Sequence, residues 1–315
     1  MRPGESPGGI SSEWPSLELD GWKDTYATLH MWTQIVGKTR LALAPMENHW
    51  WQIALYVTPR GLTTSSIPSG GRVFCVDFDF IEHQLLVRVS DGTQGSLPLT
   101  PQSVADFYAG YFRTLRSLGL DVRIHPVPVE VEIAIPFRQD HTHAAYDPDA
   151  ANRCWRLLVQ VDRVLKRFKS RFLGKASPVH FFWGSFDLAM TRFSGRGAPR
   201  HPGGAPNCPN YVMEEAYSRE CSSFGFWPGG GPITEPVFYS YAYPEPPGYP
   251  LHTVRPADAR YTQELREFII PYEAIRRAPD PDEAILAFFQ SAYEAAADLG
   301  HWDRAALERP TTEGS

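Results

Sequence analysis

The sequence predicts an α+β protein made of two similar units, each with a helix, an antiparallel sheet and a second helix. Amphipathic segments with clear helix start and stop signals alternate with short β-favouring runs, and their order in the first half recurs in the second. With 315 residues, the chain is long enough for one large core or two coupled cores. We therefore predict a tandem duplication whose units are related by a pseudo-twofold axis.

Four helices are predicted from the spacing of apolar residues and from the signals at their ends. Asp147 and Asp280 are N-caps that are each followed by a proline in the first turn, and a glycine follows the last apolar residue of every helix. The predicted helices cover residues 22–37, 100–119, 147–174 and 280–300.

Short runs rich in β-branched and aromatic residues predict strands between these helices. Residues 74–80 alternate between apolar and polar side chains and turn at Glu82-His83 into a second run, which is typical of a hairpin. The prolines in residues 127–135 place that run at a sheet edge. The predicted strands cover residues 50–58, 74–80, 85–89, 127–135, 179–190 and 237–243.

Matching positions in the two halves support the duplication. Gly37-Lys38 and Gly174-Lys175 follow the first helix of each half, and His49-Trp50-Trp51 and His180-Phe181-Phe182 then open a strand. A chance match of weak signals is the alternative. The predicted organisation is a disordered lead-in at residues 1–12, a first repeat at 13–139, a second repeat at 140–309 with a Gly/Pro-rich loop at 194–236, and a tail at 310–315.

The bulk composition favours a cytoplasmic protein without a membrane partner. The formal net charge is −6, and every apolar run is far shorter than the ~18 residues of a membrane-spanning helix. The four cysteines have no C-x-x-C spacing, which fits a reducing compartment. An acidic total offers no general attraction to nucleic acid, so a nucleic-acid partner is not favoured. The oligomeric state is left open.

One segment, residues 153–175, is strongly basic and amphipathic. Arg156, Arg163 and Arg167 lie opposite its apolar stripe at helical spacing. They form either a solvated helix face or a face that binds a polyanion.

The segment Asp140-His141-Thr142-His143 is a candidate metal site. On an extended chain, positions i and i+2 point to the same side, so an H-x-H pair can bind one metal ion. Together with His180 and Asp140, His141 and His143 would form a His/carboxylate site for a divalent metal such as Fe, Zn or Mn. The alternative is a pair of loop histidines next to a helix cap.

The aromatic segment 179–196 carries most of the other candidates. His180 and Asp187 differ in parity, so on one ideal strand they would point to opposite faces unless a bulge near Gly184 intervenes. The arginines near the end of the segment would bind an anionic group, although salt bridges to surface acids are an equal alternative. The candidate catalytic residues are His49, His180, Asp187 and Tyr146, and the candidate substrate-binding residues are Arg192, Arg196, Trp183 and Tyr241.

Two further patterns concern carboxylates and phenols. The pairs Asp77 with Asp79 and Glu130 with Glu132 are best explained by exposed polar faces of a sheet, although paired carboxylates can also act as acid and base. The alternating tyrosines at 239, 241 and 243 could line one face of a strand. No dinucleotide-binding, Walker A, G-x-S-x-G or H-E-x-x-H motif is present, which disfavours the common chemistries of those motifs.

The sequence resembles a bacterial family known as domain of unknown function 5996. The matching stretches include Asn48-His49-Trp50-Trp51, Val76-Asp77-Phe78-Asp79-Phe80 and the aromatic segment from Gly174 to Arg196. The resemblance extends over roughly residues 12 to 309 and implies a single bacterial cytoplasmic protein, with no established activity. Arg219 stands where the family commonly has histidine, which puts a site using that imidazole in doubt.

The leading expectation for function is an enzyme that acts on a small organic molecule in an aromatic-lined pocket between the two units. Metal-assisted hydrolysis or oxygenation through a His/carboxylate site is the expected chemistry. The alternative is a non-catalytic small-molecule-binding or scaffold protein with structural histidines.

Overall fold

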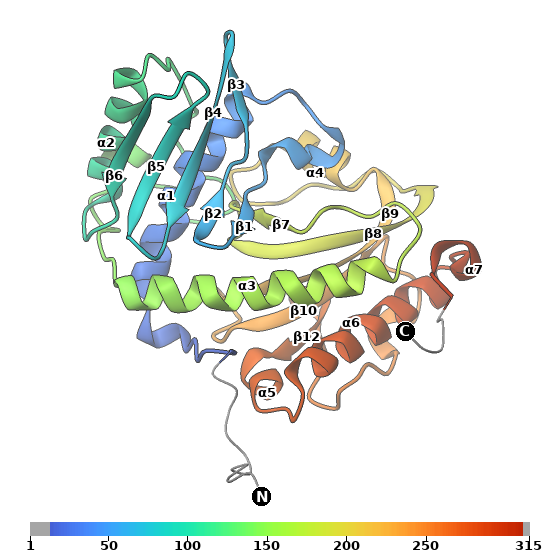
Figure 1. The fold of residues 1–315 in the computed structure, drawn as a ribbon. Coiled ribbons are helices and arrows are strands. Elements are labelled where there is room, and N and C mark those ends of the chain that lie inside the picture. The colour runs from blue at the N-terminus through green and yellow to red at the C-terminus, as the bar shows by residue number, and fades with distance from the viewer. Residues whose placement is uncertain (1–12, 311–315) are drawn as a thin grey trace, which may run out of the picture.

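Two antiparallel sheets, one in each half of the chain, form the framework of the fold (Figure 1). The computed structural model of the protein describes residues 13–310, so the predicted lead-in and most of the predicted tail lie outside the described residues. The α+β class is confirmed.

Long helices precede and follow each sheet, and shorter ones lie in the connections. The α-helices are α1 (Lys23–Leu43), α2 (Val104–Ser117), α3 (Pro148–Ser170), α4 (Asn210–Ala216), α5 (Tyr272–Arg276), α6 (Pro281–Leu299) and α7 (Arg304–Leu307). The 3-10 helices are η1 (Leu19–Gly21), η2 (Asn48–Ile53), η3 (Phe137–Gln139) and η4 (Tyr249–Leu251).

Both sheets are built largely from strands that follow one another along the chain. The first has the order β1-β2-β4-β5-β6, with β3 paired to β4, and the second has the order β11-β12-β10-β9-β8-β7. The first sheet contains β1 (Tyr56–Thr58), β2 (Gly61–Thr63), β3 (Ile67–Ser69), β4 (Arg72–Asp79), β5 (Gln84–Val89) and β6 (Gln94–Pro98). The second contains β7 (His180–Phe182), β8 (Asp187–Gly197), β9 (Arg219–Trp227), β10 (Val237–Tyr243), β11 (Arg260–Thr262) and β12 (Glu267–Pro271).

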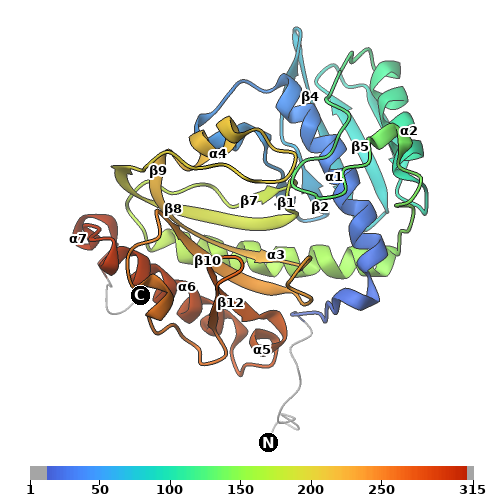
Figure 2. The same cartoon turned by 180° about the vertical axis from the view of Figure 1, so that it is seen from behind.

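The first sheet is packed on one face only. Helices α1 and α2 lie across that face (Figure 2), where Phe74, Val76 and Phe78 of β4 are buried. Trp32 of α1 stacks on Phe107 of α2, with ring centroids 4.6 Å apart. Val73, Cys75 and Asp77 point to the other face and are more exposed, because side chains alternate along a strand, whereas Asp79 at the end of β4 is buried.

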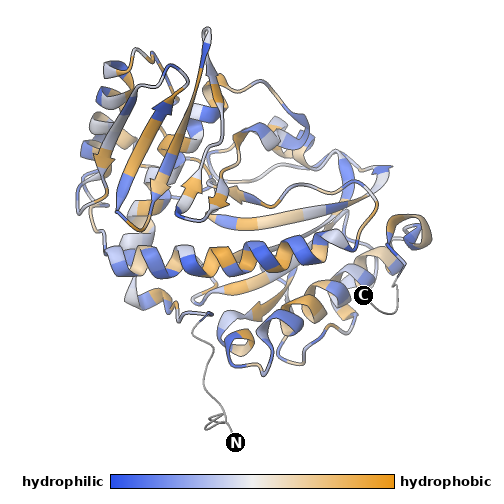
Figure 3. Ribbon diagram, viewed as in Figure 1, coloured by the Kyte–Doolittle hydropathy of each residue, from blue (hydrophilic) through white to orange (hydrophobic). Residues whose placement is uncertain are grey.

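The second sheet is covered on both faces. The apolar stripe of α3, visible in Figure 3, packs with α6 on one face: Phe168 of α3 lies 4.8 Å from Phe224 of β9, and Phe289 of α6 lies 6.0 Å from Phe238 of β10 between ring centroids. On the other side, η2 and α4 contact each other above the sheet. The space between these elements and the sheet contains the candidate site described below.

The two sheets meet at their edges. Leu55, just before β1, exchanges two backbone hydrogen bonds with Phe181 of β7, at 2.9 and 2.8 Å. The Trp183 indole donates a hydrogen bond to the Ile53 carbonyl (2.8 Å) and lies against Gly37 of α1, where an added Cβ would be 2.2 Å from the ring. Gly37 therefore does not end the first helix as predicted; it permits this close approach while α1 continues to Leu43.

Four further predicted elements differ from the structure. His49 and Trp50 have positive φ values of 60° and 62°, so residues 48–53 form η2 and only Tyr56–Thr58 of the predicted run is a strand. Residues 127–135 form no strand, and their backbone instead bonds the Gln34 side chain of α1 at Val129. Helix α2 begins at Val104 with Ser103 as its cap, and α3 ends at Ser170, before Gly174.

Candidate functional site

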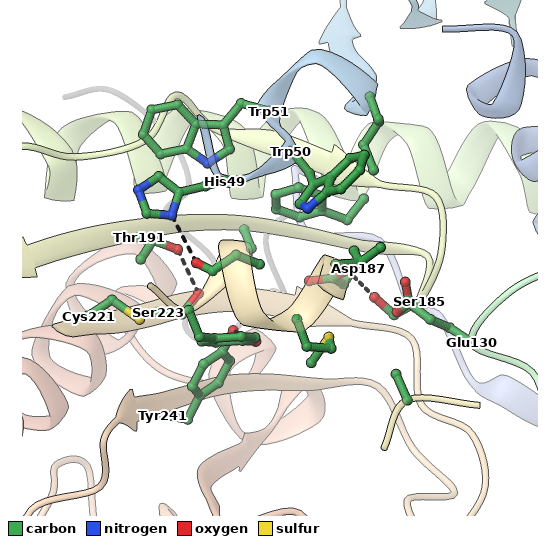
Figure 4. A pocket seen from close by; sticks show the side chains of 18 of the residues that line it. His49, Trp50, Trp51, Glu130, Ser185, Asp187, Thr191, Cys221, Ser223 and Tyr241 are labelled. Atoms are coloured by element: carbon green, nitrogen blue, oxygen red, sulfur yellow. Dashed lines mark hydrogen bonds between the residues drawn. The ribbon is translucent and has the colours of Figure 1, made fainter. Parts of the chain in front are cut away.

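A cavity of about 200 Å³ lies between the second sheet and the covering elements η2 and α4 (Figure 4). Its aromatic lining includes Trp50, Trp51, Phe182, Phe193, Tyr239 and Tyr241, and its polar lining includes His49, Glu130, Ser185, Asp187, Thr191 and Ser223. An adjoining cavity of about 240 Å³ shares Ser185, Asp187 and the tyrosines and adds Glu267 of β12. Together they form one recess along the sheet, which is the kind of site that small molecules occupy.

Strand alternation explains why these side chains share one face. Thr191 in β8 lies opposite Ser223 in β9, and their hydroxyl groups are 3.0 Å apart. Tyr241 in β10 pairs with Ser223 in the same ladder, so it points to the same side. The predicted alignment of the alternating tyrosines is confirmed for Tyr239 and Tyr241, whose rings stack with centroids 6.1 Å apart.

A tight hairpin changes the expected relation between His180 and Asp187. Residues 183–186 form a turn, so the predicted strand 179–190 is two strands, β7 and β8. Phe182 pairs with Asp187 and His180 pairs with Ala189. Directly paired residues point to the same face of a sheet, so the prediction of opposite faces is wrong.

Asp187 is buried and held by two hydroxyl groups. Ser185 Oγ donates a hydrogen bond to Oδ1 at 2.6 Å, and the Tyr239 hydroxyl donates to Oδ2. Burial raises the pKa of Asp187 despite these two donors. The neighbouring phenols are linked as well, since the hydroxyls of Tyr217 and Tyr241 are 2.7 Å apart.

Two glutamates join Asp187 at the same end of the recess. Much of Glu130 is exposed, but its carboxyl points toward Ser185 and Asp187 (Figure 4), and a Cβ on Gly184 would be 2.1 Å from its Oε1. Burial of this carboxyl, with a smaller contribution from Asp187, raises the pKa of Glu130 to about 7. The same two causes raise the pKa of Glu267 to about 8. Perturbed acids that share a cavity are typical of functional sites.

His49 lies at the opposite end of the cavity. Its Nδ1 donates a hydrogen bond to the Ala216 carbonyl of α4 (2.9 Å), and its Nε2 is 3.4 Å from Lys175 Nζ. Burial is the largest cause that lowers the pKa of His49, and Lys175 contributes. The left-handed backbone of His49 and Trp50 costs on the order of 1–2 kcal/mol per residue, and it places both side chains over the sheet.

His180 is fully buried beside the cavity but does not line it. Its ring lies 5.9 Å from Trp51 and 5.5 Å from Tyr56 between centroids. Neither ring nitrogen has a hydrogen-bond partner among residues 13–310, and burial, assisted by the charge of Arg40, lowers the pKa of His180 to about 3. The two predicted histidines are thus near each other, with Trp51 in contact with both.

The four candidate metal ligands are not brought together. Asp140 accepts a 2.7 Å hydrogen bond from His143 Nδ1, and the backbone carbonyls of both residues bond the first turn of α2. His180 belongs to β7 of the other sheet, and His141 is exposed. Within residues 13–310, no group of three or more His, Cys, Asp and Glu side chains could hold a metal ion. The expected shared site is therefore not formed by these residues.

Four other candidates lie away from the cavity. Arg192 is on the opposite face of β8, where its guanidinium lies 3.6 Å from the centre of the Phe168 ring and donates to the Phe168 carbonyl. Arg196 bonds Glu220 at the end of β8. Tyr146 bonds His83 in the first unit, and Trp183 fills the junction with α1. Of the predicted catalytic and substrate-binding residues, His49, Asp187 and Tyr241 line the cavity.

Sequence patterns predict neither glutamate as a site residue. For Glu130 they favour an exposed strand face and leave an acid–base role as the alternative, but it lies in an irregular segment with a positive φ of 58°, where no periodicity indicates its direction. Glu267 opens β12, and its position in the strand gives no signal that it faces Asp187. Only the assembled sheet brings these acids to one recess.

The basic face of α3 is neutralised by the start of α6. Arg163 and Arg167 both bond Asp282, and Arg167 also bonds Glu283 at 2.8 Å. Two of the three arginines that could have formed a polyanion-binding face are therefore paired within the chain.

The fold and the cavity define an α+β protein with a recess lined by aromatic and acidic side chains. The chain belongs to a family of unknown function, DUF5996, whose family model matches residues 14–309. No curated protein and no solved structure shows significant similarity to it. None of the described helices is long and apolar enough to cross a membrane.

Proposed function

We propose that the recess binds a small organic molecule and that its carboxyl groups exchange protons with that molecule. The observation that supports this proposal is the convergence of Asp187, Glu130 and Glu267, each with a raised pKa, on an aromatic cavity. A group whose pKa is near the working pH is best suited to give and take protons. The proposal uses no metal ion, since His180 of β7 is separated from the segment that holds Asp140, His141 and His143, and no group of three or more metal-binding side chains forms among residues 13–310.

The geometry suggests distinct roles for the acids. Ser185 and Tyr239 hold the Asp187 carboxyl in one orientation, which suits a group that must meet a reacting atom at a defined position. Glu130 has no such restraint, and its pKa of about 7 lets it act as acid or base near neutral pH. Trp50 and Tyr241 would position the molecule through ring contacts.

Proton exchange with a bound molecule tests the proposal before the reaction is known. A thermal-shift screen of small organic compounds supplies ligands, and NMR in D₂O then measures deuterium incorporation into each bound compound. We expect the Asp187→Asn and Glu130→Gln variants to slow this exchange on the order of a hundredfold. The matched control is Asp77→Asn in the first sheet, which should leave the rate unchanged.

Two results would contradict the proposal. Ligands that bind equally well to the wild type and to a Trp50→Ala, Tyr241→Phe double variant do not occupy this cavity. Exchange that persists at the wild-type rate in Asp187→Asn and Glu130→Gln does not use these acids.

A second candidate function is ligand binding without turnover. The supporting observation is that both Asp187 oxygens already accept hydrogen bonds and that His49 is engaged at both ring nitrogens. In that case the compounds from the screen would bind in the cavity but would show no deuterium incorporation.

We also propose that the two units arose by tandem duplication. Both contain an antiparallel sheet that follows a long helix, α1 or α3, and precedes another, α2 or α6. The contact between Leu55 and Phe181 is antiparallel, as a twofold relation between the first strands would require. Superposition of residues 22–119 on residues 147–300 tests this, and halves that do not superpose would refute it.

A further inference from the structure

The charged groups around the recess are acidic. Glu130 and Asp187 line the main cavity and Glu267 lines the adjoining one, whereas neither lining includes a lysine or an arginine. In the part of the chain that the structure describes, none of the three acids has a basic side chain among the groups that shift its pKa. The lining histidine, His49, is neutral at neutral pH because its pKa is lowered.

The groups that face these acids from the surrounding elements add no positive charge. Their electrostatic neighbours are Tyr26 of α1, Cys208 of the loop before α4, Tyr217 after α4, Tyr239 of β10 and Tyr249 of η4. Two lysines, Lys175 and Lys38, belong to neither lining. Lys175 is held at the other end by His49, and Lys38 is buried next to Trp183 and interacts with Cys208.

The walls of the recess include several aromatic side chains, and the faces of aromatic rings attract cations. Trp51 already makes such a contact from outside, since Lys175 Nζ lies 5.2 Å from the centre of its ring. Trp50 and the stacked rings of Tyr239 and Tyr241 line the interior and are available for similar contacts. The recess thus combines aromatic rings with carboxyl groups, and no lysine or arginine is among its lining residues in the described part of the chain.

We propose that the molecule bound in this recess is an organic cation, of the primary to quaternary ammonium class. This inference rests on the proposed function of the cavity and names its ligand class. An ammonium group supplies the missing counter-charge to the carboxyls, while its alkyl groups pack against the aromatic rings. An anionic ligand would meet three acids and no lining lysine or arginine.

If the ligand is a cation, its binding must release protons, and its affinity must depend on pH. Without a bound cation, Glu130 and Glu267 hold protons over part of the neutral pH range, because their pKa values are raised to about 7 and about 8. A bound cation favours their ionised form, so binding releases protons to the solvent. The affinity for a cation must therefore rise as the pH rises through about 7 to 8 and level off above it.

Isothermal titration calorimetry with two isosteric probes tests the inference on the full chain. The probes are choline and its uncharged analogue 3,3-dimethylbutan-1-ol, measured at pH 6, 7 and 8.5 in buffers with different ionisation enthalpies. We expect choline to bind at least tenfold more tightly, with proton release at pH 7 and affinity that increases with pH. Glu130→Gln and Glu267→Gln, which keep the side-chain shape, should each weaken choline binding about tenfold, and Asp77→Asn should not.

The other outcomes overturn the inference in distinguishable ways. Equal binding of both probes, lost in Trp50→Ala, overturns the cation class but leaves the small-molecule cavity intact. Tighter binding of the carboxylate analogue 3,3-dimethylbutanoate than of choline also overturns the cation class and leaves the small-molecule cavity intact. Choline binding that Trp50→Ala, Glu130→Gln and Glu267→Gln leave unchanged overturns the assignment to this recess, and no binding of any probe overturns the cation class.

Discussion

The two sheets place their carboxylates in opposite electrostatic surroundings. In the first sheet, Asp77 and Asp79 of β4 meet Arg88 and Arg60, and hydrogen bonds from Arg60 and two backbone amides lower the pKa of Asp79 despite its burial. In the second sheet, Asp187 meets hydroxyl groups and other acids, and burial raises its pKa. The comparison teaches that the partner of a buried strand aspartate decides its pKa. An arginine partner stabilises the ionised form, whereas hydroxyl groups alone do not offset the effect of burial.

The largest expected effect is a loss of stability when Asp79 of the first sheet is replaced. Asp79 accepts hydrogen bonds from Arg60 Nε at 2.6 Å and from the backbone amides of Ile81 and Glu82 at 2.9 and 3.0 Å. Asp79→Ala leaves these amides unpaired, so we expect a loss of about 3 kcal/mol in the free energy of unfolding by urea denaturation. Asp187→Asn should change it by less than about 1 kcal/mol, because none of the described groups that shift the pKa of this buried carboxyl is a cation that the substitution would leave unpaired. A larger loss for Asp187→Asn would break the comparison.

The pH dependence of stability should also differ in sign between Glu267 of the second sheet and Asp79 of the first. The folded pKa of Glu267 is raised to about 8, so the folded state holds a proton that the unfolded state has released, and stability falls as the pH rises from about 4.5 to 8. Glu267→Gln removes this fall, and we expect a gain of about 2 °C in Tm at pH 8 but none at pH 4. Asp79 has a lowered pKa, so its contribution is present above its unfolded pKa, about 3.9, and is lost as the pH falls below it. Parallel melting curves across pH 3–9 check both statements.

A smaller effect on stability is expected at Gly184, together with a change in pKa. An alanine Cβ there would lie 2.1 Å from Oε1 of Glu130, which is the flexible end of a side chain and can move away. The displaced carboxyl should regain solvent, so the pKa of Glu130 should fall from about 7 toward its ordinary value in a ¹³C NMR titration. Gly71→Ala is the matched control, since nothing lies within 4 Å of its added Cβ. An unchanged pKa in Gly184→Ala would mean that Glu130 does not depend on this contact.

The smallest expected effect concerns the exposed ion pair of the first sheet. Arg88 is half-exposed, so its salt bridge to Asp77 is screened by water and salt. We expect Asp77→Asn to change the free energy of unfolding by less than about 1 kcal/mol and this difference to disappear at high salt. A loss as large as that of Asp79→Ala would show that burial is not what separates the two aspartates.

Local signals in the sequence predicted the long helices and the hairpins best. Asp147 and Asp280 cap α3 and α6 with a proline in the first turn, as predicted, because these signals act within a few residues. The prediction failed at residues 48–53, where aromatic residues favoured a strand but η2 forms. There the left-handed backbone of His49 and Trp50 is stabilised by distant groups, such as the Ala216 carbonyl that His49 bonds.

The site likewise contains features that depend on local sequence and features that depend on distant contacts. The shared direction of Tyr239 and Tyr241 could be predicted, since it depends only on the period of a strand. The relation of His180 to Asp187 was not, because a turn at residues 183–186 replaced the single strand assumed. Arg192 lies beyond the end of the predicted strand at residue 190, whereas β8 continues to Gly197 and places its guanidinium against Phe168 of α3.

Taken alone, the sequence determined the α+β class, the family, the long helices and the aromatic character of the second half, since all of these depend on residue type and short-range spacing. Tertiary structure alone decided which acids share a recess and which meet an arginine. Glu130, Asp187 and Glu267 come from separate segments. Their positions relative to one another follow from the register of the second sheet and from the irregular segment at residues 127–135. Because electrostatic interactions depend on distance and burial rather than on separation along the chain, the character of this site emerges only when the chain is folded.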